Sequence, residues 1–498
     1  MNELVNTING YIWSLPLIYL CLGVGLYFSL RTRFLQVRHI KEMVRLMFQG
    51  GSSAAGISSF QALALSLSGR VGTGNIAGVA TAITFGGPGA VFWMWVVAFL
   101  GSGTAFVESA LAQIYKEKDD NGLYRGGPAF YIEKGLGMKW YAWVFAISTV
   151  LACGMLLPGV QANSIASGIE HAFGIPTTVS AAVVVILLGM IIFGGVKRIA
   201  HFTQIVVPFM ALGYILVAFV ILVLHIGEVP EVISLIVGSA FGMKAGFGAI
   251  LGLAIEWGVK RGIYSNEAGQ GTGPHAAAAA EVSHPAKQGL VQSFSVYIDT
   301  LFVCSATAFM IIITGAYNVM GKAGDAIVEK LPGVEAGPGY TQAAVESVMP
   351  GFGGIFVAVA LFFFAFTTIL AYYYIAETNI AYINRKVHRP WLMFALKLVL
   401  MASVVYGSVK TAGLAWGLGD IGVGLMAWLN IVAILLLQKP ALLALKDYEA
   451  QKAQGLDPTF DPVKLGIKNA DHWVNKDTSS RPSSSADTPE LKPQADRS

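Results

Sequence analysis

The chain has 498 residues, of which 55% are hydrophobic and only 12% are charged, and its formal net charge is +4. A soluble protein usually carries about 25% charged residues, so half of that fraction cannot cover the water-facing surface of so long a chain. Apolar stretches of about 20 residues recur from end to end. The composition therefore indicates a polytopic membrane protein and excludes soluble enzymes and nucleic-acid-binding proteins.

Hydropathy predicts eleven transmembrane helices, so the expected fold class is an all-α polytopic membrane protein. The spans lie near residues 11–30, 57–84, 88–115, 140–168, 177–195, 202–226, 245–263, 287–315, 352–380, 391–409 and 416–438. No basic segment precedes the first span and no small-residue cleavage site follows it, so we expect a retained helix rather than a signal peptide. The three cysteines fall inside apolar stretches, which leaves no disulfide framework and no metal-binding spacing.

The loop charges predict the orientation, because Lys and Arg resist translocation and accumulate on the cytoplasmic side. In the segments that join the spans, 15 Lys and Arg residues lie on one side and 4 on the other. This asymmetry places the N-terminus outside and the C-terminus in the cytoplasm. From about residue 443 the composition turns polar, and we expect 443–498 to be a disordered cytoplasmic tail.

Two of the predicted spans contain glycine clusters and charges that do not suit a plain helix. One cluster occupies 66–78 and the other 255–274. Because glycine in a helix costs about 0.5–1 kcal/mol relative to Ala, we expect each helix to stop and restart there. Unwound backbone at membrane depth is tolerated only where it lines a cavity or is buried in protein.

The two breaks divide the chain into related regions. Residues 1–55 form an N-terminal helix and a basic cytoplasmic loop, 56–226 a first group of five helices, and 245–438 a second group of five. Each group begins with a broken helix, and because five is odd the second group enters the membrane from the opposite side. This is the plan of secondary transporters built from inverted repeats, in which broken helices meet near the bilayer midplane.

A broken helix offers main-chain N–H groups at one new end and carbonyl groups at the other, and these carry partial charges of opposite sign. At the first break we expect the amides of Thr73 and Gly74 to face a substrate carboxylate, with Asn75 beside them. The carbonyls near Ser68 and Val71 would face a cation. The alternative is that the glycines only allow two helices to pack closely.

Two further spans carry polar side chains in apolar surroundings. Thr367 and Thr368 supply adjacent hydroxyls, and neutral oxygens can hold a desolvated sodium ion without burying a full charge. Alternatively, each hydroxyl bonds the carbonyl four residues earlier. Gln161 needs a partner because a buried amide is costly, and that partner is either the substrate or the backbone of a neighbouring helix.

Charged side chains inside the spans should be paired or face water. We expect four of them to act as gate or network charges, namely Arg70, Glu256, Glu267 and Asp299. Glu108, Lys260 and Arg261 are placed near the cytoplasmic ends of their spans, where snorkelling or pinning a loop is the expected role. The chain has no HExxH, GxSxG, P-loop or CxxC motif, so we expect no enzyme activity.

Four segments of the chain are similar to a known family. They are FQALALSLSGRVGTGNIAGVATAI at 60–83, GGPGAVFWMW at 86–95, YRGGPAFYIEKGLG at 124–137 and WGVKRGIYSNEAGQGTGPHAAAAA at 257–280. Over about residues 1–445 the chain resembles the sodium-coupled alanine/glycine symporters of bacteria and archaea. The resemblance implies a leucine-transporter-like fold with one extra helix before a core of ten. Family members often have Met, Leu or Ile where this chain has Gln270.

The resemblance also implies the residues of a binding site. A small amino acid would bind at Thr73, Gly74, Asn75 and Gln161, and the second break around Trp257 and Gly258 would complete the pocket. Sodium, the coupling ion, would be held by the carbonyls of Ser68, Val71 and Phe364 and by the hydroxyls of Thr367 and Thr368.

These observations predict a transporter of the bacterial inner membrane that couples sodium entry to uptake of alanine or glycine by alternating access. Its expected partners are the amino acid and the lipid bilayer, with no nucleic acid and no obligate protein partner. Two alternatives remain: a proton-coupled transporter or exchanger of the same fold, and an amino-acid-gated channel.

Overall fold

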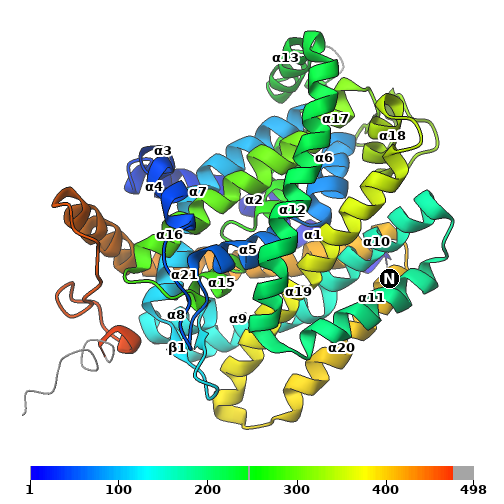
Figure 1. The fold of residues 1–498 in the computed structure, drawn as a ribbon. Helices are drawn as coiled ribbons and strands as arrows, with labels where there is room; N and C mark the ends of the chain where they lie inside the picture. Colours follow the sequence, from blue (N-terminus) through cyan, green and yellow to red (C-terminus); the bar gives the residue numbers. More distant parts are fainter. Residues whose placement is uncertain (1, 245–246, 475–498) are drawn as a thin grey trace, which may run out of the picture.

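The computed structural model describes residues 2–244 and 247–474, and within them it is built almost entirely of helices (Figure 1). Strands are confined to two small antiparallel hairpins, β1 (Glu117–Lys118) with β2 (Tyr124–Arg125), and β3 (Asn318–Met320) with β4 (Ala326–Glu329). The all-α class is therefore confirmed. Seven helices in the described residues are long and apolar enough to cross a membrane, or eight if the bent pair of α1 (Asn2–Ile12) and α2 (Leu15–Arg31) is one span.

Each of the eleven apolar segments is helical, and several are built from two pieces. The elements are α2, α5 (Ser59–Arg70) with α6 (Val79–Gly86), α7 (Gly89–Ile114), α9 (Lys139–Leu151) with α10 (Leu157–Phe173), α11 (Thr177–Ile192), α12 (Gly195–Leu224), α14 (Leu251–Asn266), α16 (Pro285–Val296) with α17 (Ser305–Ile313), α19 (Gly353–Val387), α20 (Trp391–Ser408) and α21 (Ala412–Ala453). Short π-helical segments join several pieces, including Gly74–Gly78 before α6 and Tyr297–Cys304 before α17.

Shorter helices lie in the connections. They are α3 (Leu35–Arg38), α4 (Ile40–Met47), α8 (Pro128–Tyr131), α13 (Val229–Ala240), α15 (Gly273–Ala279) and α18 (Pro338–Val348). Hydropathy windows did not reveal them because they are too short or too polar to resemble a span.

The two broken helices lie inside the bundle, next to one another. The α5 helix packs against α15 and α19, and α6 packs against α14, so each half of one broken helix contacts a half of the other. Around them, α7 packs along α14 and α16, and α10 packs along α19 and α20. This arrangement buries both breaks in protein, as unwound backbone at membrane depth requires.

Residues 443–474 are folded, whereas from the sequence we expected a disordered tail over 443–498. The α21 helix continues to Ala453, and the segment 454–474 folds back on the bundle. There the Phe460 N–H donates to the Ser283 carbonyl (3.1 Å) and the Trp473 indole N–H donates to the Gln113 carbonyl (2.9 Å). The buried rings of Phe460 and Trp473 pack edge to face, and they supply apolar area that the average composition of the tail concealed. Residues 475–498 lie outside the described part of the chain.

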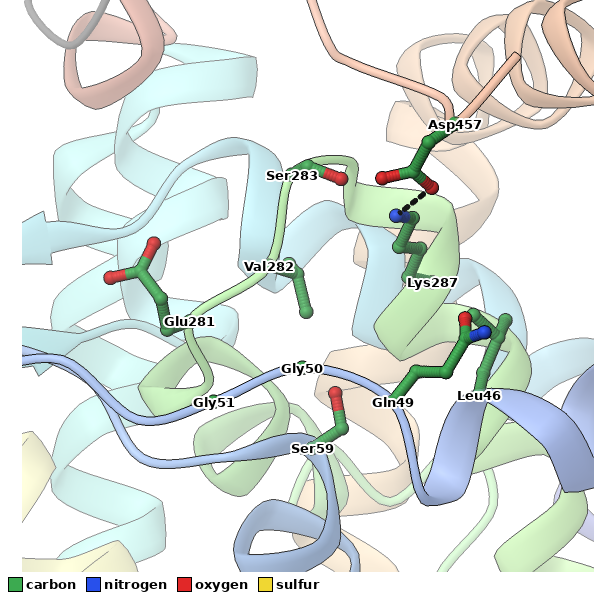
Figure 2. Close-up of a pocket in the computed structure, with 10 residues that line it drawn as sticks. All are labelled: Leu46, Gln49, Gly50, Gly51, Ser59, Glu281, Val282, Ser283, Lys287 and Asp457. Carbon is green, nitrogen blue, oxygen red and sulfur yellow. Dashed lines mark hydrogen bonds and ion pairs between the residues drawn. The ribbon is translucent and has the colours of Figure 1, made fainter.

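A cavity of about 490 Å³ lies where this returning segment meets the start of α16 and the loop before α5 (Figure 2). On one side Lys287 forms an ion pair with Asp457 (2.6 Å), and on the other the backbone of Gly50 and Gly51 runs past Ser59.

Candidate functional site

The first break separates α5 from the π-helical segment that leads into α6. Residues 71–73 lie between them, and the Gly72 N–H donates to the Asn75 side-chain oxygen (2.8 Å) instead of to a helical carbonyl. Glycine is required at position 72, because a Cβ there would collide with the Thr368 hydroxyl and lie 3.0 Å from the Gln161 oxygen. The break therefore lets α5, α10 and α19 approach one another closely.

Two carbonyl oxygens at this break and one of α19 converge on one hydroxyl. Thr368 Oγ1 lies 2.7 Å from the Ser68 carbonyl oxygen, 3.5 Å from that of Val71 and 2.9 Å from that of Phe364. A hydroxyl carries a single hydrogen, so it can satisfy only one of the three carbonyls at a time. The result is a buried cluster of four neutral oxygens from α5 and α19, which is the donor type that a desolvated monovalent cation requires.

The neighbouring hydroxyl behaves differently. Thr367 Oγ1 lies 2.9 Å from the Phe363 carbonyl oxygen and 3.0 Å from that of Phe364, so in this structure it makes the local bond common in membrane helices. It also contacts the Met210 sulfur of α12. Of the five residues expected to hold sodium, four therefore meet at the Thr368 hydroxyl, with Thr367 one position away.

Three of the residues expected to bind substrate, Thr73, Gly74 and Gln161, lie next to the same break. The Thr73 N–H donates to Gln161 Oε1 (3.0 Å), so the amide oxygen of α10 occupies a main-chain donor of the break. Gly74 packs against Tyr264 and Ser265 at the end of α14, which a Cβ on Gly74 would approach to 3.2 Å and 3.4 Å. The hydroxyl of Thr73 is buried and has no hydrogen-bond partner among the described residues.

The second break lies within the predicted 255–274 cluster, but beyond Trp257 and Gly258. The α14 helix is continuous through Trp257 and Gly258 to Asn266, and the chain is non-helical only at 267–272. The placement of the break around Trp257 and Gly258 was therefore wrong. Gly258 serves close packing, because a Cβ there would collide with α7 at Ala90 and Trp93.

Left-handed backbone makes the break instead. Glu267, Gly269 and Gly271 have φ values of +57°, +84° and +86°, which end α14 and turn the chain into α15. Trp257 stacks on Phe85 and lines the same cavity as Lys260, Arg261 and Asp420.

Glu108 of α7 holds the second break in place. Its carboxylate accepts hydrogen bonds from the Gly269 N–H (3.2 Å) and from the Asn430 side chain (2.7 Å), and Asn430 also donates to the Gly269 carbonyl (2.9 Å). Glu108 is fully buried, so it pins a loop and does not snorkel. Sequence reasoning missed Asn430, because a single Asn in an apolar helix carries no pattern.

Asp299 connects the two breaks. Its carboxylate accepts hydrogen bonds from Asn75 (2.6 Å) after the first break, from Ser265 (3.0 and 3.1 Å) before the second, and from the adjacent Thr300 (2.7 Å). A buried carboxylate with three donors is well stabilised, and losing one donor would leave part of it unpaired. Asp299, which we expected to be a gate or network charge, therefore contacts both broken helices.

Arg70, at the end of α5, reaches α16. Its Nη1 donates to the Gln292 carbonyl (3.1 Å) and contacts the Ser295 hydroxyl, and its charge interacts with the buried carboxylates of Glu267, Glu108 and Asp299. Glu267 lies at the break itself, where its side-chain oxygens approach Gly69 of α5. Glu256 lies apart from this group, and its charge interacts with Lys260.

An ion-pair cluster lies at the base of a cavity of about 740 Å³. Asp420 of α21 pairs with Lys260 (2.8 Å) and with Arg261 (2.8 Å), and the Arg261 guanidinium lies 4.6 Å from the ring of Trp416. The ring of Trp416 in turn lies 4.9 Å from that of Tyr264, beside Gly74.

The position of this cluster corrects an expectation from the sequence. The cavity is also lined by Asn6, Asn9 and residues of the 316–351 segment, which the charge count places outside. Lys260 and Arg261 therefore lie on the same side of the bundle as the 316–351 segment, and not at the opposite end of their span, where we expected them from the sequence. The sequence ended that span at 263, whereas the chain continues beyond the break into α15.

The opposite ends of the broken helices are joined. The Ile57 N–H, just before α5, donates to the Ala279 carbonyl at the end of α15 (3.0 Å), and the Glu281 N–H donates back to the Ile57 carbonyl (2.8 Å). The structure thus has a cavity on one side of the breaks and a main-chain bridge on the other.

Comparison with known proteins gives a consistent result. A model of the sodium:alanine symporter family matches residues 1–462. The YrbD protein of Bacillus subtilis (strain 168) is 67% identical over 96% of this chain and 99% of its own length. The sodium/proton-dependent alanine carrier protein of Bacillus sp. (strain PS3) is 58% identical over 87% of this chain and 97% of that protein. The sodium/alanine symporter AgcS of Methanococcus maripaludis is 40% identical over 87% of this chain and 94% of that protein.

Among solved structures, a variant of the manganese transporter of Eremococcus coleocola covers 87% of this chain and 97% of its own, with a TM-score of 0.53 and 12% sequence identity. At this identity the likeness shows a shared fold and nothing about the substrate.

Proposed function

Because the chain belongs to the sodium:alanine symporter family, we propose that it uses sodium entry to drive alanine uptake by alternating access. The observation that carries the proposal is the convergence of the Ser68, Val71 and Phe364 carbonyls on the Thr368 hydroxyl. Sodium bound among these oxygens would tie α19 to the first break. The ion would thereby hold the break in the shape that receives the amino acid.

The substrate would bind on the other side of the same break. Its carboxylate would take the Thr73 and Gly74 amides, displacing the Gln161 oxygen from the Thr73 N–H, while Asn75 stays anchored to Asp299. The close packing of Tyr264 and Ser265 against Gly74 favours a substrate with a small side chain. Glycine, which is smaller than alanine, would fit the same space.

Two features would control access. On the outer side, the Asp420 pairs with Lys260 and Arg261 and the ring of Trp416 would separate the cavity from the binding site. On the cytoplasmic side, the bridge between Ile57 and Ala280 would have to open for release. Arg70 at the end of α5 and Glu267 at the second break carry opposite charges, and their attraction would stabilise the closed form.

The membrane arrangement follows from the same proposal. We infer eleven spans in the bacterial inner membrane, with the N-terminus outside, the C-terminus in the cytoplasm, and two five-helix groups of inverted orientation. The helical pieces at all eleven apolar segments and the contact between the two broken helices support this arrangement.

Uptake by purified protein in liposomes tests the function. An inward sodium gradient should drive accumulation of labelled alanine, and replacing external sodium with choline should abolish it. If a proton gradient drove the same accumulation with no sodium present, the coupling ion would be wrong. Steady currents far above the alanine flux would indicate a channel.

A further inference from the structure

The exposed face of α3 and α4 carries two parallel stripes of side chains. One stripe is apolar and consists of Val37, Ile40, Val44 and Phe48, which are 56%, 44%, 39% and 73% exposed. Val37 lies in α3, Ile40 and Val44 share one side of α4 because they are four residues apart, and Phe48 follows directly after α4. The buried residues Leu35, Met43 and Leu46 face the bundle, so the exposed apolar stripe is not part of the core.

The second stripe is basic. Each of its members directly follows an apolar residue of the first stripe in the sequence, namely Arg38, Lys41 and Arg45. Two more basic residues, Arg31 and Arg33, lie at and just after the end of α2. Residues 31–56 contain five basic residues and a single acidic one, Glu42. A helix with apolar and basic stripes side by side is typical of elements that lie in a membrane interface.

Part of this positive charge is already neutralised within the protein. Arg38 pairs with Glu449 (2.8 Å), and Arg45 pairs with Glu42. Arg31, Arg33 and Lys41 are exposed and have no ion-pair partner in the part of the chain that the structure describes. Three positive charges therefore face outward beside exposed apolar side chains.

The position of the element agrees with an interfacial location. Left-handed backbone at Arg33 (φ 55°) and Phe34 (φ 53°) turns the chain sharply after α2. The α3 and α4 helices then lie at the edge of the bundle near α7 and α16, and α4 packs against α16 and α5 (Figure 1).

We propose that α3 and α4 form a lipid-binding element whose apolar stripe enters the membrane interface while Arg31, Arg33 and Lys41 bind anionic lipid headgroups. Charge complementarity selects this occupant, since a leaflet rich in anionic lipid supplies negative headgroups next to apolar chains. The element would bind the cytoplasmic leaflet, and only this choice of leaflet rests on the proposed function and its membrane orientation.

This element is mechanically connected to the first broken helix. The ring of Phe48 stacks on that of Phe60 in α5, with ring centroids 5.8 Å apart. Headgroup binding at α4 would therefore fix the start of α5, which must move when the bridge between Ile57 and Ala280 opens.

The first test measures depth in the bilayer. A spin label on Val44→Cys is compared with one on Asp120→Cys, which lies in the exposed turn between β1 and β2. The native cysteines Cys21, Cys153 and Cys304 are buried, so the label should not reach them. In liposomes we expect the Val44 label to be accessible to oxygen and shielded from a water-soluble nickel complex, with the reverse for the control. Equal exposure of both labels to nickel would overturn the proposal, as would shielding of the Val44 label from both reagents, which would indicate a covering protein or a second copy of the chain.

The second test measures charge. Detergent-solubilised protein is titrated with a pyrene-labelled phosphatidylglycerol. The triple variant Arg31→Gln, Arg33→Gln, Lys41→Gln should bind it at least tenfold more weakly, since each basic residue near an anionic surface contributes about fivefold. A control triple variant neutralises the exposed Lys322, Lys330 and Lys410 and should bind like the unaltered protein. Equal affinity of the first variant and the unaltered protein would overturn the proposal, whatever the result of the uptake experiment.

Discussion

The Thr368 hydroxyl of α19 lies 2.7 Å from the Ser68 carbonyl oxygen of α5, a residue 300 positions earlier in the chain. Replacing Thr368 with Val keeps the shape of the side chain and removes this oxygen. We expect the apparent sodium affinity to fall at least tenfold, because the loss of an oxygen ligand to a cation should cost about as much as the loss of a hydrogen bond to a charged group, about 1.5–3 kcal/mol. The concentration of sodium that gives half-maximal alanine uptake measures this change.

Thr367→Val is the matched control, since its hydroxyl bonds its own helix in this structure. It should shift the sodium dependence less than Thr368→Val. An unchanged sodium requirement in the Thr367→Ala, Thr368→Ala double variant would refute the proposed sodium site.

Gly72→Ala tests the close approach at the first break. The added Cβ would collide with the Thr368 hydroxyl and press on the Gln161 oxygen, so we expect lost uptake and a destabilisation of about 1–3 kcal/mol. Thermal unfolding in detergent and uptake in liposomes measure the two effects. Gly252→Ala is the control, because nothing lies within 4 Å of a Cβ at that position. Normal uptake by Gly72→Ala would show that the break does not need this contact.

The positions of the helices could be predicted from hydropathy because an apolar stretch has few alternatives in a membrane. The position of the second break was harder to predict, because glycines in that stretch have two separate structural roles. Gly258 allows α14 to pack on α7, whereas Gly269 and Gly271 adopt left-handed backbone. Both uses look the same in a single sequence.

Long-range partners were also beyond prediction from the sequence. Asp420 lies 159 residues from Arg261, and Asn430 lies 322 residues from Glu108, so no local pattern connects them. By contrast, the first break and its neighbours Ser68, Val71 and Asn75 are contiguous. Their grouping could therefore be read from one short motif.

Asp420→Asn should destabilise the protein by about 3–5 kcal/mol, because it leaves the buried charges of Lys260 and Arg261 without their shared carboxylate. The apparent unfolding temperature of the purified protein measures this loss. Asp457→Asn removes another ion pair, with Lys287, in which Asp457 is mostly exposed. That variant should cost less than about 1 kcal/mol. Equal effects of the two substitutions would show that the Asp420 cluster is not stabilising.

His284 makes the packing of the returning C-terminal segment sensitive to pH. Its Nδ1 accepts the Ala286 N–H (3.1 Å) and its ring packs against Phe460, and burial lowers the pKa of His284 below the ordinary value of 6.5. A lowered pKa means that His284 binds a proton more readily when the returning segment has detached from it. The stabilisation is therefore complete above about pH 6.5 and declines as the pH falls toward the folded pKa.

Hydrogen exchange of residues 456–474 measures this effect, and protection should decrease below about pH 6.5. His284→Asn keeps an acceptor for the Ala286 N–H but cannot take up a proton. The pH dependence of exchange should disappear in this variant. If it persisted unchanged, His284 would not be the titrating group.

The most direct test of the coupled site is equilibrium binding of labelled sodium and labelled alanine, each measured with and without the other. If sodium at Thr368 shapes the break that receives alanine, each ligand must increase the affinity for the other by the same factor. We predict such a reciprocal increase in the unaltered protein and its loss in Thr368→Val. Alanine affinity that is independent of sodium in the unaltered protein would contradict the account.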